Sequence, residues 1–174
     1  MELNLRESIE ILERTPSVLE ALLTGLSSNW VRADEGEGSW SPYLVVGHLI
    51  HGEKTDWMVR ANIILSQVKN KNFAPYDRFA QLHEDQDRPL KDMLIEFRQL
   101  RSSNLRQLRA RVISSEILGL EGNHPDFGKV TLSQLISAWV VHDLNHIVQI
   151  SRVMAKRYDT EVGPWKAYLG ILKN

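Results

Sequence analysis

The feature that most constrains this chain is the spacing of its apolar residues, which recur at intervals of three and four along most of the sequence. Such spacing places apolar side chains on one face of an α-helix, whereas a half-buried strand requires alternation of apolar and polar residues. We find no alternating segment in the sequence, and no Asn-Gly or Asp-Gly pair that would mark a tight hairpin. The pattern therefore predicts an all-α protein.

Proline, glycine and polar clusters divide this pattern into four long segments. We expect helices over about residues 3–26, 42–69, 89–116 and 131–158, separated chiefly by loops over residues 28–40 and 119–129. Four long helices with moderate connections predict an antiparallel four-helix bundle. The length of 174 residues fits a single domain over residues 1–174.

The ends of the predicted helices carry recognisable signals. Ser41-Pro42 has the form of an N-cap followed by proline at the first helical position, and Thr131 to Gln134 has the form of a capping box. Thr15-Pro16 carries the same start signal inside the first segment, so we expect a kink or a break there.

Composition excludes several classes of function. The chain has no cysteine, which rules out disulfides, thiolate metal sites, iron–sulfur clusters and cysteine nucleophiles. The net charge of −1 gives no global attraction to nucleic acid or to an anionic membrane, and we read the arginines between residues 98 and 111 as a solvated or dimer-facing helix surface. Neither a membrane span nor a signal peptide is evident, so we expect a cytoplasmic protein that contacts neither membrane nor nucleic acid.

The chemistry of the chain is concentrated in the sequence His142-Asp-Leu-Asn-His146. Residues four apart on a helix point the same way, and two imidazoles at that spacing can bind one metal ion. The pair lies on the apolar stripe that includes Leu135 and Trp139, so both rings should face the core. A buried polar group without a partner costs roughly 1–3 kcal/mol, which a shared metal ion would offset. The spacing alone leaves open the alternative of two core histidines that are each hydrogen-bonded to their neighbours.

A third ligand has to come from another segment. His48 lies on the inward face of the second predicted helix, and His51 follows three residues later; we favour His48, although either could reach the core. His83 and His124 lie in predicted polar loops and are expected to be exposed. Three imidazoles suit zinc, nickel, cobalt or ferrous iron and leave coordination positions open.

Three carboxylates lie near these histidines in the sequence. Glu53 and Asp56 follow His48 by one to two helical turns, where either could accept a hydrogen bond from a ligand ring or act as a general base; solvent exposure is the alternative for both. Asp143 is expected to point away from His142 and to pair with an arginine or a lysine.

Three stretches of the chain together resemble the DinB-like superfamily of four-helix bundles. They are Ser39 to Glu53, Asn123 to Gly128 and Val141 to Ile150, and the resemblance in their order and spacing covers nearly the whole chain. It implies that His48, His142 and His146 bind a divalent metal ion, with zinc or nickel first and iron, cobalt or manganese as alternatives. It also implies a homodimer.

The resemblance is less specific about the reaction. Some relatives are transferases that use a low-molecular-weight thiol such as bacillithiol, some are mycothiol-dependent isomerases, and others are described as hydrolases. We expect a metal-dependent enzyme, either a thiol-dependent S-transferase with a metal-bound thiol cosubstrate or a hydrolase with a metal-bound water. The alternative is a non-catalytic, metal-stabilised stress-response or interaction protein. No catalytic residue is assigned from the sequence.

Overall fold

The computed structural model describes residues 3–112 and 114–173, which form mainly helices. The long helices agree with the all-α prediction, although a small hairpin accompanies them. The α-helices are α1 (Leu5–Leu23), α2 (Ser28–Val31), α3 (Pro42–Thr55), α4 (Trp57–Leu65), α5 (Leu90–Arg111) and α6 (Leu132–Lys156). Shorter elements are the 3₁₀ turns η1 (Ala80–His83), η2 (Ser115–Gly119), η3 (Gly163–Tyr168) and η4 (Gly170–Leu172), and the strands β1 (Glu121–His124) and β2 (Gly128–Thr131).

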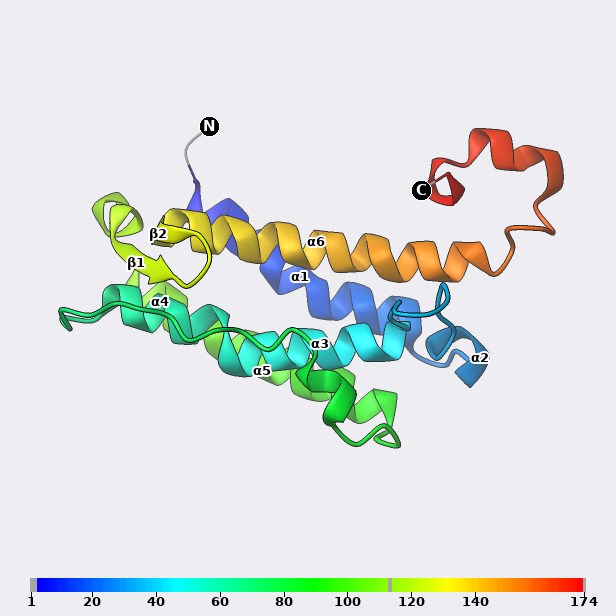
Figure 1. Ribbon diagram of the computed structural model, residues 1–174, viewed down its shortest axis with the longest axis horizontal. Helices are drawn as coiled ribbons and strands as arrows, with labels where there is room; N and C mark the ends of the chain where they lie inside the picture. The colour runs from blue at the N-terminus through cyan, green and yellow to red at the C-terminus, as the bar shows by residue number, and fades with distance from the viewer. Residues whose placement is uncertain (1–2, 113, 174) are drawn as a thin grey trace.

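The four members of the bundle are α1, α3 with α4, α5 and α6 (Figure 1). The directions of the helices do not simply alternate: α1 runs parallel to α6, and α3 runs parallel to α5, with each pair antiparallel to the other. The connection over residues 66–89 makes this order feasible, because it returns along the face of α3 and α4 before α5 begins (Figure 1). No helix in the described part of the chain is long and apolar enough to cross a membrane.

The second helix of the bundle is interrupted, where the sequence predicts one helix over residues 42–69. Asp56 ends α3 and begins α4 with φ −115° and ψ −81°, outside the helical region. A continuous helix would place Val59 on the same inward face as His48 and Gly52. The interruption shifts the faces of the two helices, and Val59 is instead 44% exposed. Gly52, one turn earlier, leaves room for the Trp57 indole, since a Cβ there would lie 3.2 Å from its Nε1 atom.

The sequence predicts a kink or a break at Pro16. The first helix is continuous through this residue, so the break is wrong. Proline has no N–H, and the carbonyl of the residue four positions earlier therefore loses its usual donor. That residue is Leu12, and the Nη1 atom of Arg101 in α5 donates to its carbonyl at 2.8 Å. The helix is thus completed by a side chain from another helix.

Arg101 also binds two buried carboxylates and so connects all four members of the bundle. Its Nε donates to Oε1 of Glu53 in α3 at 3.0 Å, and its two terminal nitrogens donate to the two oxygens of Asp143 in α6 at 2.5 and 2.9 Å. The expected pairing of Asp143 with an arginine is confirmed. The expectation that the arginines of this helix are solvated is wrong for Arg101, which is 1% exposed.

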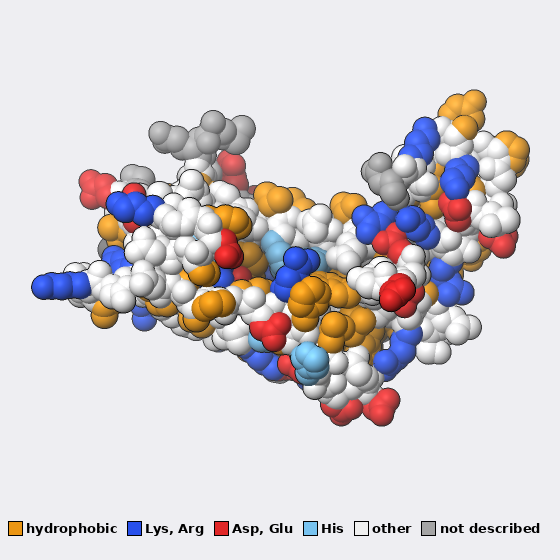
Figure 2. Space-filling model, viewed as in Figure 1, with side chains coloured by type: hydrophobic (Ala, Val, Ile, Leu, Met, Phe, Trp, Pro, Cys, Tyr) orange, Lys and Arg blue, Asp and Glu red, His pale blue; other side chains and the backbone are white. Residues whose placement is uncertain are grey.

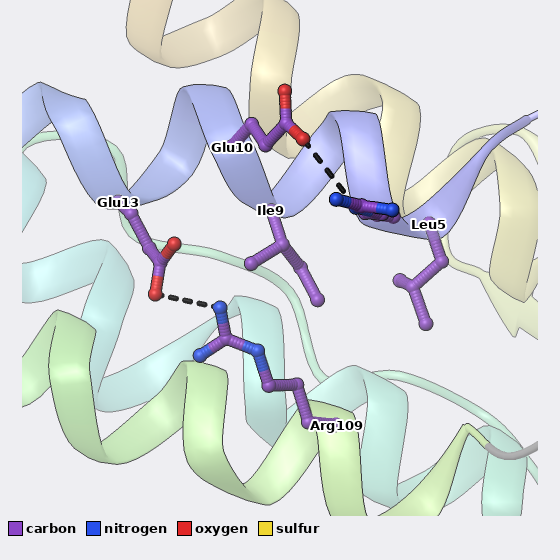
Figure 3. A pocket seen from close by; sticks show the side chains of 6 residues that line it. Leu5, Ile9, Glu10, Glu13 and Arg109 are labelled. Carbon is purple, nitrogen blue, oxygen red and sulfur yellow. Dashed lines mark hydrogen bonds and ion pairs between the residues drawn. The ribbon is translucent and has the colours of Figure 1, made fainter.

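Other arginines of α5 pair with α1 at the surface. Figure 3 shows the groove between these helices, a cavity of about 440 Å³ beside Leu5 and Ile9. Arg109 binds Glu13 across it at 2.6 Å, and Glu10 pairs with Arg6 along α1 at 3.6 Å. The Arg109–Glu13 pair therefore joins α5 to α1, whereas Glu10 and Arg6 pair within α1.

A β-hairpin occupies the segment that was expected to be a loop over residues 119–129. Strands β1 and β2 pair antiparallel with Glu121 opposite Thr131 and His124 opposite Gly128. Gly128 adopts φ +70°, which suits the end of a three-residue hairpin connection. Gly122 packs against the core so closely that a Cβ would lie 2.6 Å from the Phe73 ring.

The apolar core consists of two clusters, one at each end of the bundle. The cluster at the hairpin end includes Leu12, Leu105 and Trp139, and the cluster at the other end includes Leu19, Phe97 and Ile150. Arg101 and Asp143 lie between these positions along α5 and α6. The middle of the bundle is therefore polar, and the histidines described below lie at this level.

We expect the Arg101→Met variant to lose about 3–5 kcal/mol of unfolding free energy, because the buried carboxylates lose their partner. The Leu12 carbonyl loses its donor as well. The control is Arg106→Met on the exposed side of the same helix, which should change stability by no more than about 0.5 kcal/mol. Urea denaturation followed by circular dichroism measures both, and equal effects would contradict a central role for Arg101.

Candidate metal centre

Three histidine side chains converge in the middle of the bundle. Nε2 of His142 lies 3.1 Å from Nε2 of His48 and 3.1 Å from Nε2 of His146. A ligand atom from each of the three lies within 4.8 Å of the others. His48 comes from α3 and the other two from successive turns of α6, so the packing of two antiparallel helices assembles the group. We call these three residues the histidine triad.

The triad cannot be satisfied by hydrogen bonds among its own members. A neutral imidazole nitrogen carries either one proton or one lone pair. Nε2 of His142 faces two other ring nitrogens at 3.1 Å, so it can make a good hydrogen bond with only one of them. A cation bound by all three lone pairs removes this conflict, and the three residues could therefore hold a metal ion.

The electrostatics of the triad keep its lone pairs available. Burial, and then the charge of His146, lower the pKa of His48 to about 4. Burial, followed by the neighbouring His146, His48 and Arg101, lowers the pKa of His142 to about 2. The pKa of His146 is lowered by burial as well, against the opposing effects of Gln149 and Asp143. All three rings are therefore neutral near pH 7, which is the form that binds metal ions.

One outer partner of the triad is well defined. Nδ1 of His146 lies 2.8 Å from Oε1 of Gln149, one turn further along α6. If the amide oxygen accepts the Nδ1 proton, Nε2 of that ring is left unprotonated, which is the usual arrangement around a metal-binding histidine. Nδ1 of His48 and Nδ1 of His142 are buried and have no hydrogen-bond partner among the described residues.

Aromatic side chains surround the triad. The Trp40 ring lies 4.8 Å from the His48 ring, the Trp57 ring lies 5.1 Å from the His142 ring, and the Tyr76 ring lies 5.9 Å from the His48 ring. His142 remains partly exposed. In the space-filling view, histidine surface appears near the middle of the molecule, just below α6 (Figure 2). The positions of these aromatic residues around the triad could not be predicted from the sequence, because they come from separate segments of the chain.

The carboxylates proposed from the sequence have distinct environments. Glu53 is 4% exposed and accepts hydrogen bonds from Arg101, from Asn104 and, at 3.2 Å, from the Trp139 indole. Burial raises its pKa, although its cationic partner opposes that shift. Asp56 is 6% exposed and pairs with Arg60 at 2.6 Å. The oxygens of Glu53 are therefore occupied within the polar centre of the fold. The alternative of solvent exposure is wrong for both carboxylates.

The remaining histidines lie outside the triad. His51 is partly buried and its Nε2 atom lies 3.2 Å from Oγ1 of Thr55. His83 is exposed, as expected. His124, expected to be exposed, is instead partly buried on the hairpin, where its ring stacks on Phe127 at 4.3 Å.

Solved structures with the same fold carry little sequence identity to this chain. YfiT from Bacillus subtilis, described as a probable metal-dependent hydrolase with an unusual four-helix bundle topology, aligns with a TM-score of 0.74 at 20% identity and covers 88% of this chain and 87% of its own. TT2238, described as a four-helix bundle protein, aligns with a TM-score of 0.55 at 20% identity and covers 87% and 99%. At this identity the likeness establishes the four-helix-bundle fold alone, which confirms the predicted fold class.

Comparison of sequences gives the family. Among curated proteins, none matches this chain significantly. The sequence pattern of the DinB superfamily, however, matches residues 11–150, which cover most of α1 and α6, all of α3, α4 and α5, and the complete histidine triad. The chain belongs to the DinB superfamily.

Proposed function

We propose that this protein is a divalent-metal-dependent hydrolase whose metal ion is bound by His48, His142 and His146. The observation that carries the proposal is the convergence of three neutral Nε2 atoms, with 3.1 Å between His142 and each of the others. Three protein ligands leave positions open for water or substrate, as in catalytic zinc sites. Zinc or nickel fits three imidazoles best, and iron, cobalt and manganese are the alternatives.

The charges around the triad favour a cation. Arg101 contributes one positive charge to the buried polar centre, and Glu53 and Asp143 contribute two negative charges. Asp143 follows His142 directly in α6, and its charge raises the pKa of His146 against the effect of burial, so it favours positive charge at the triad. A divalent ion bound by neutral imidazoles would be stabilised by it, because charges interact more strongly in a buried environment than in water.

When bound, such an ion supplies Lewis acidity, which lowers the pKa of a water or a thiol held on it. The chain must then provide a group that accepts a proton, and Asp56 is the residue we propose. Its pKa is raised, chiefly because burial penalises the charged form, with Arg60 opposing the shift. Glu53 is a poorer candidate because its oxygens already accept hydrogen bonds from three side chains.

A thiol-dependent S-transferase that uses a low-molecular-weight thiol is the competing proposal, since it needs the same ion and no protein nucleophile. A single domain, a homodimer and a cytoplasmic location remain predictions from the sequence and its family resemblance. YfiT supports the hydrolase by its description as a probable metal-dependent hydrolase.

The metal content of the purified protein tests the ligand assignment. We expect about one divalent ion per chain, and His142→Ala should weaken binding by more than about 100-fold, because even the loss of an outer partner costs 10–100-fold. Gln149→Leu, which removes the outer partner of His146, should weaken metal binding by about 10–100-fold. The control is His83→Ala, at an exposed site. Mass spectrometry of the metal content and titration calorimetry measure these effects, and unchanged binding in His142→Ala would rule out the assignment.

The reaction class is tested by turnover with and without a thiol. We expect the zinc- or nickel-loaded protein to hydrolyse an activated ester such as p-nitrophenyl acetate at a rate independent of added thiol. Asp56→Asn should lower kcat by about 10²–10⁴-fold, as expected for a lost general base. Asp92→Asn, at an exposed position of α5, is the control.

The competing transferase makes the opposite prediction in the same experiment. Monochlorobimane would be consumed only with a low-molecular-weight thiol present, and ester hydrolysis would be absent or would not respond to Asp56→Asn. Absence of both reactions in protein that retains its metal ion would favour the non-catalytic alternative.

The pH dependence of stability tests the neutral state of the rings. Because the folded pKa values of His48 and His142 lie below the usual 6.5, the unfolded chain binds protons that the folded chain does not. The free energy of unfolding of the metal-free protein should therefore be greatest above pH 6.5. It should decrease towards pH 5 by about 1.4 kcal/mol per pH unit for each such proton. Urea denaturation after EDTA treatment measures this slope. Equal stability at pH 7.5 and pH 5 would contradict the lowered pKa values.

A further inference from the structure

A second feature of the structure is a cavity of about 560 Å³ between the start of α4, the start of α6 and the hairpin. Its volume is within the range of roughly 300–1,000 Å³ that small-molecule sites occupy. Most of its lining is apolar, as such sites usually are. The apolar side chains are Trp57, Phe73, Phe127, Val130, Leu135 and Ala138.

The cavity approaches the histidine triad, although no residue of the triad lines it. Ala138 lines it and precedes His142 in α6 by four residues, which is about one helical turn on the same face. Trp57 lines it too, and the ring of this residue lies 5.1 Å from the His142 ring. Trp57 and Ala138 are therefore the lining residues on the side of the cavity that faces the triad.

The mouth of the cavity carries an exposed aromatic ring. Phe127 is 76% exposed, yet its ring stacks on His124 with 4.3 Å between centroids and an angle of 14°. His124 in turn contacts the buried Phe73 ring edge to face at 6.3 Å. The exposed Phe127 ring, held by this stacking, offers a flat apolar surface to a planar group.

The charges that line the cavity are not balanced. Arg60 is neutralised by Asp56 at 2.6 Å, and both side chains are nearly buried. Lys129 pairs with Glu121, which does not line the cavity, and both side chains are more than half exposed. Exposed pairs of this kind contribute only about 0–1 kcal/mol, so the ammonium group can bind an anion instead.

His124 adds a neutral donor at the same place. Its Nδ1 atom accepts the backbone N–H of Asp126 at 3.1 Å. The ring proton of the neutral form is then on Nε2, where it can be donated to a ligand. Lys129 and His124 together favour a ligand with a carboxylate or a similar anionic group.

We propose that this cavity is the substrate site and that it takes a small organic anion with a flat apolar body, oriented so that one end is directed past Trp57 and Ala138 towards the triad. The Phe127 and His124 rings and Trp57 contact the body, and Lys129 binds the anionic group. The role as a substrate site and the orientation towards the triad rest on the proposed metal-dependent hydrolase. Binding of the anion itself does not.

The test uses two fluorescent probes of similar shape, the anionic 8-anilinonaphthalene-1-sulfonate and the neutral N-phenyl-1-naphthylamine. Both should bind the folded full-length protein. Phe127→Ala should weaken both probes about tenfold, the loss of roughly one aromatic contact. Ala138→Phe should weaken both at least as much by filling the cavity. Lys129→Gln should weaken only the anionic probe.

Matched controls separate the cavity from other exposed apolar surface. Tyr168→Ala removes an aromatic ring that is 86% exposed in η3, and Ala110→Phe adds a ring on the exposed face of α5. Neither should change binding of either probe. Circular dichroism shows whether each variant is folded, and Phe127→Ala tests the cavity even if Ala138→Phe does not fold.

Titrations before and after removal of metal ions with EDTA distinguish this proposal from the proposed function. Probe binding that depends on Phe127 and Lys129 in protein that binds no metal ion would support the cavity and overturn the metal centre. Metal binding at the triad, with probe binding that ignores Phe127→Ala and Ala138→Phe, would overturn the cavity alone. Equal effects of Lys129→Gln on both probes would overturn the preference for an anion.

Discussion

The interaction on which the rest of this structure depends is the set of hydrogen bonds made by the buried guanidinium group of Arg101. It binds Glu53 of α3 and Asp143 of α6, and it supplies the donor that Pro16 denies to the Leu12 carbonyl of α1. A buried charge is tolerated only when its partners satisfy it, and removal of one partner leaves the others uncompensated. The four helices are therefore fixed relative to one another at one level of the bundle, between the two apolar clusters.

The histidine triad benefits from this rigidity because its members are attached to the same helices at the same level. His142 adjoins Asp143 in α6, and His48 precedes Glu53 by five residues in α3. Anchoring the two carboxylates thus sets how far α3 lies from α6, and with it the 3.1 Å contact between His48 and His142. The same carboxylates also leave the buried centre with an excess of negative charge, which suits a site for a cation.

The sequence predicted the parts of this arrangement that follow from local spacing. Apolar periodicity gave the long helices, and the four-residue separation of His142 and His146 placed both on one buried face. Features that depend on contacts between distant segments were missed. The break expected at Pro16 is absent because Arg101 donates to the Leu12 carbonyl. Arg101 lies 85 positions after Pro16, so local spacing could not predict this contact. The hairpin was not predicted because its strands are short and polar. His124 was expected to be exposed for the same reason.

The interruption of the second helix at Asp56 is the departure from prediction with the most direct bearing on function. In a continuous helix, the inward face after Gly52 and Asp56 would continue to Val59, which is instead exposed. The changed direction lets Trp57 contact the His142 ring and also line the cavity beside the hairpin. Asp56 lines the same cavity. A local irregularity in one helix thus brings a carboxylate and an indole to the boundary between the triad and the cavity, where regular helical geometry would have buried an aliphatic side chain.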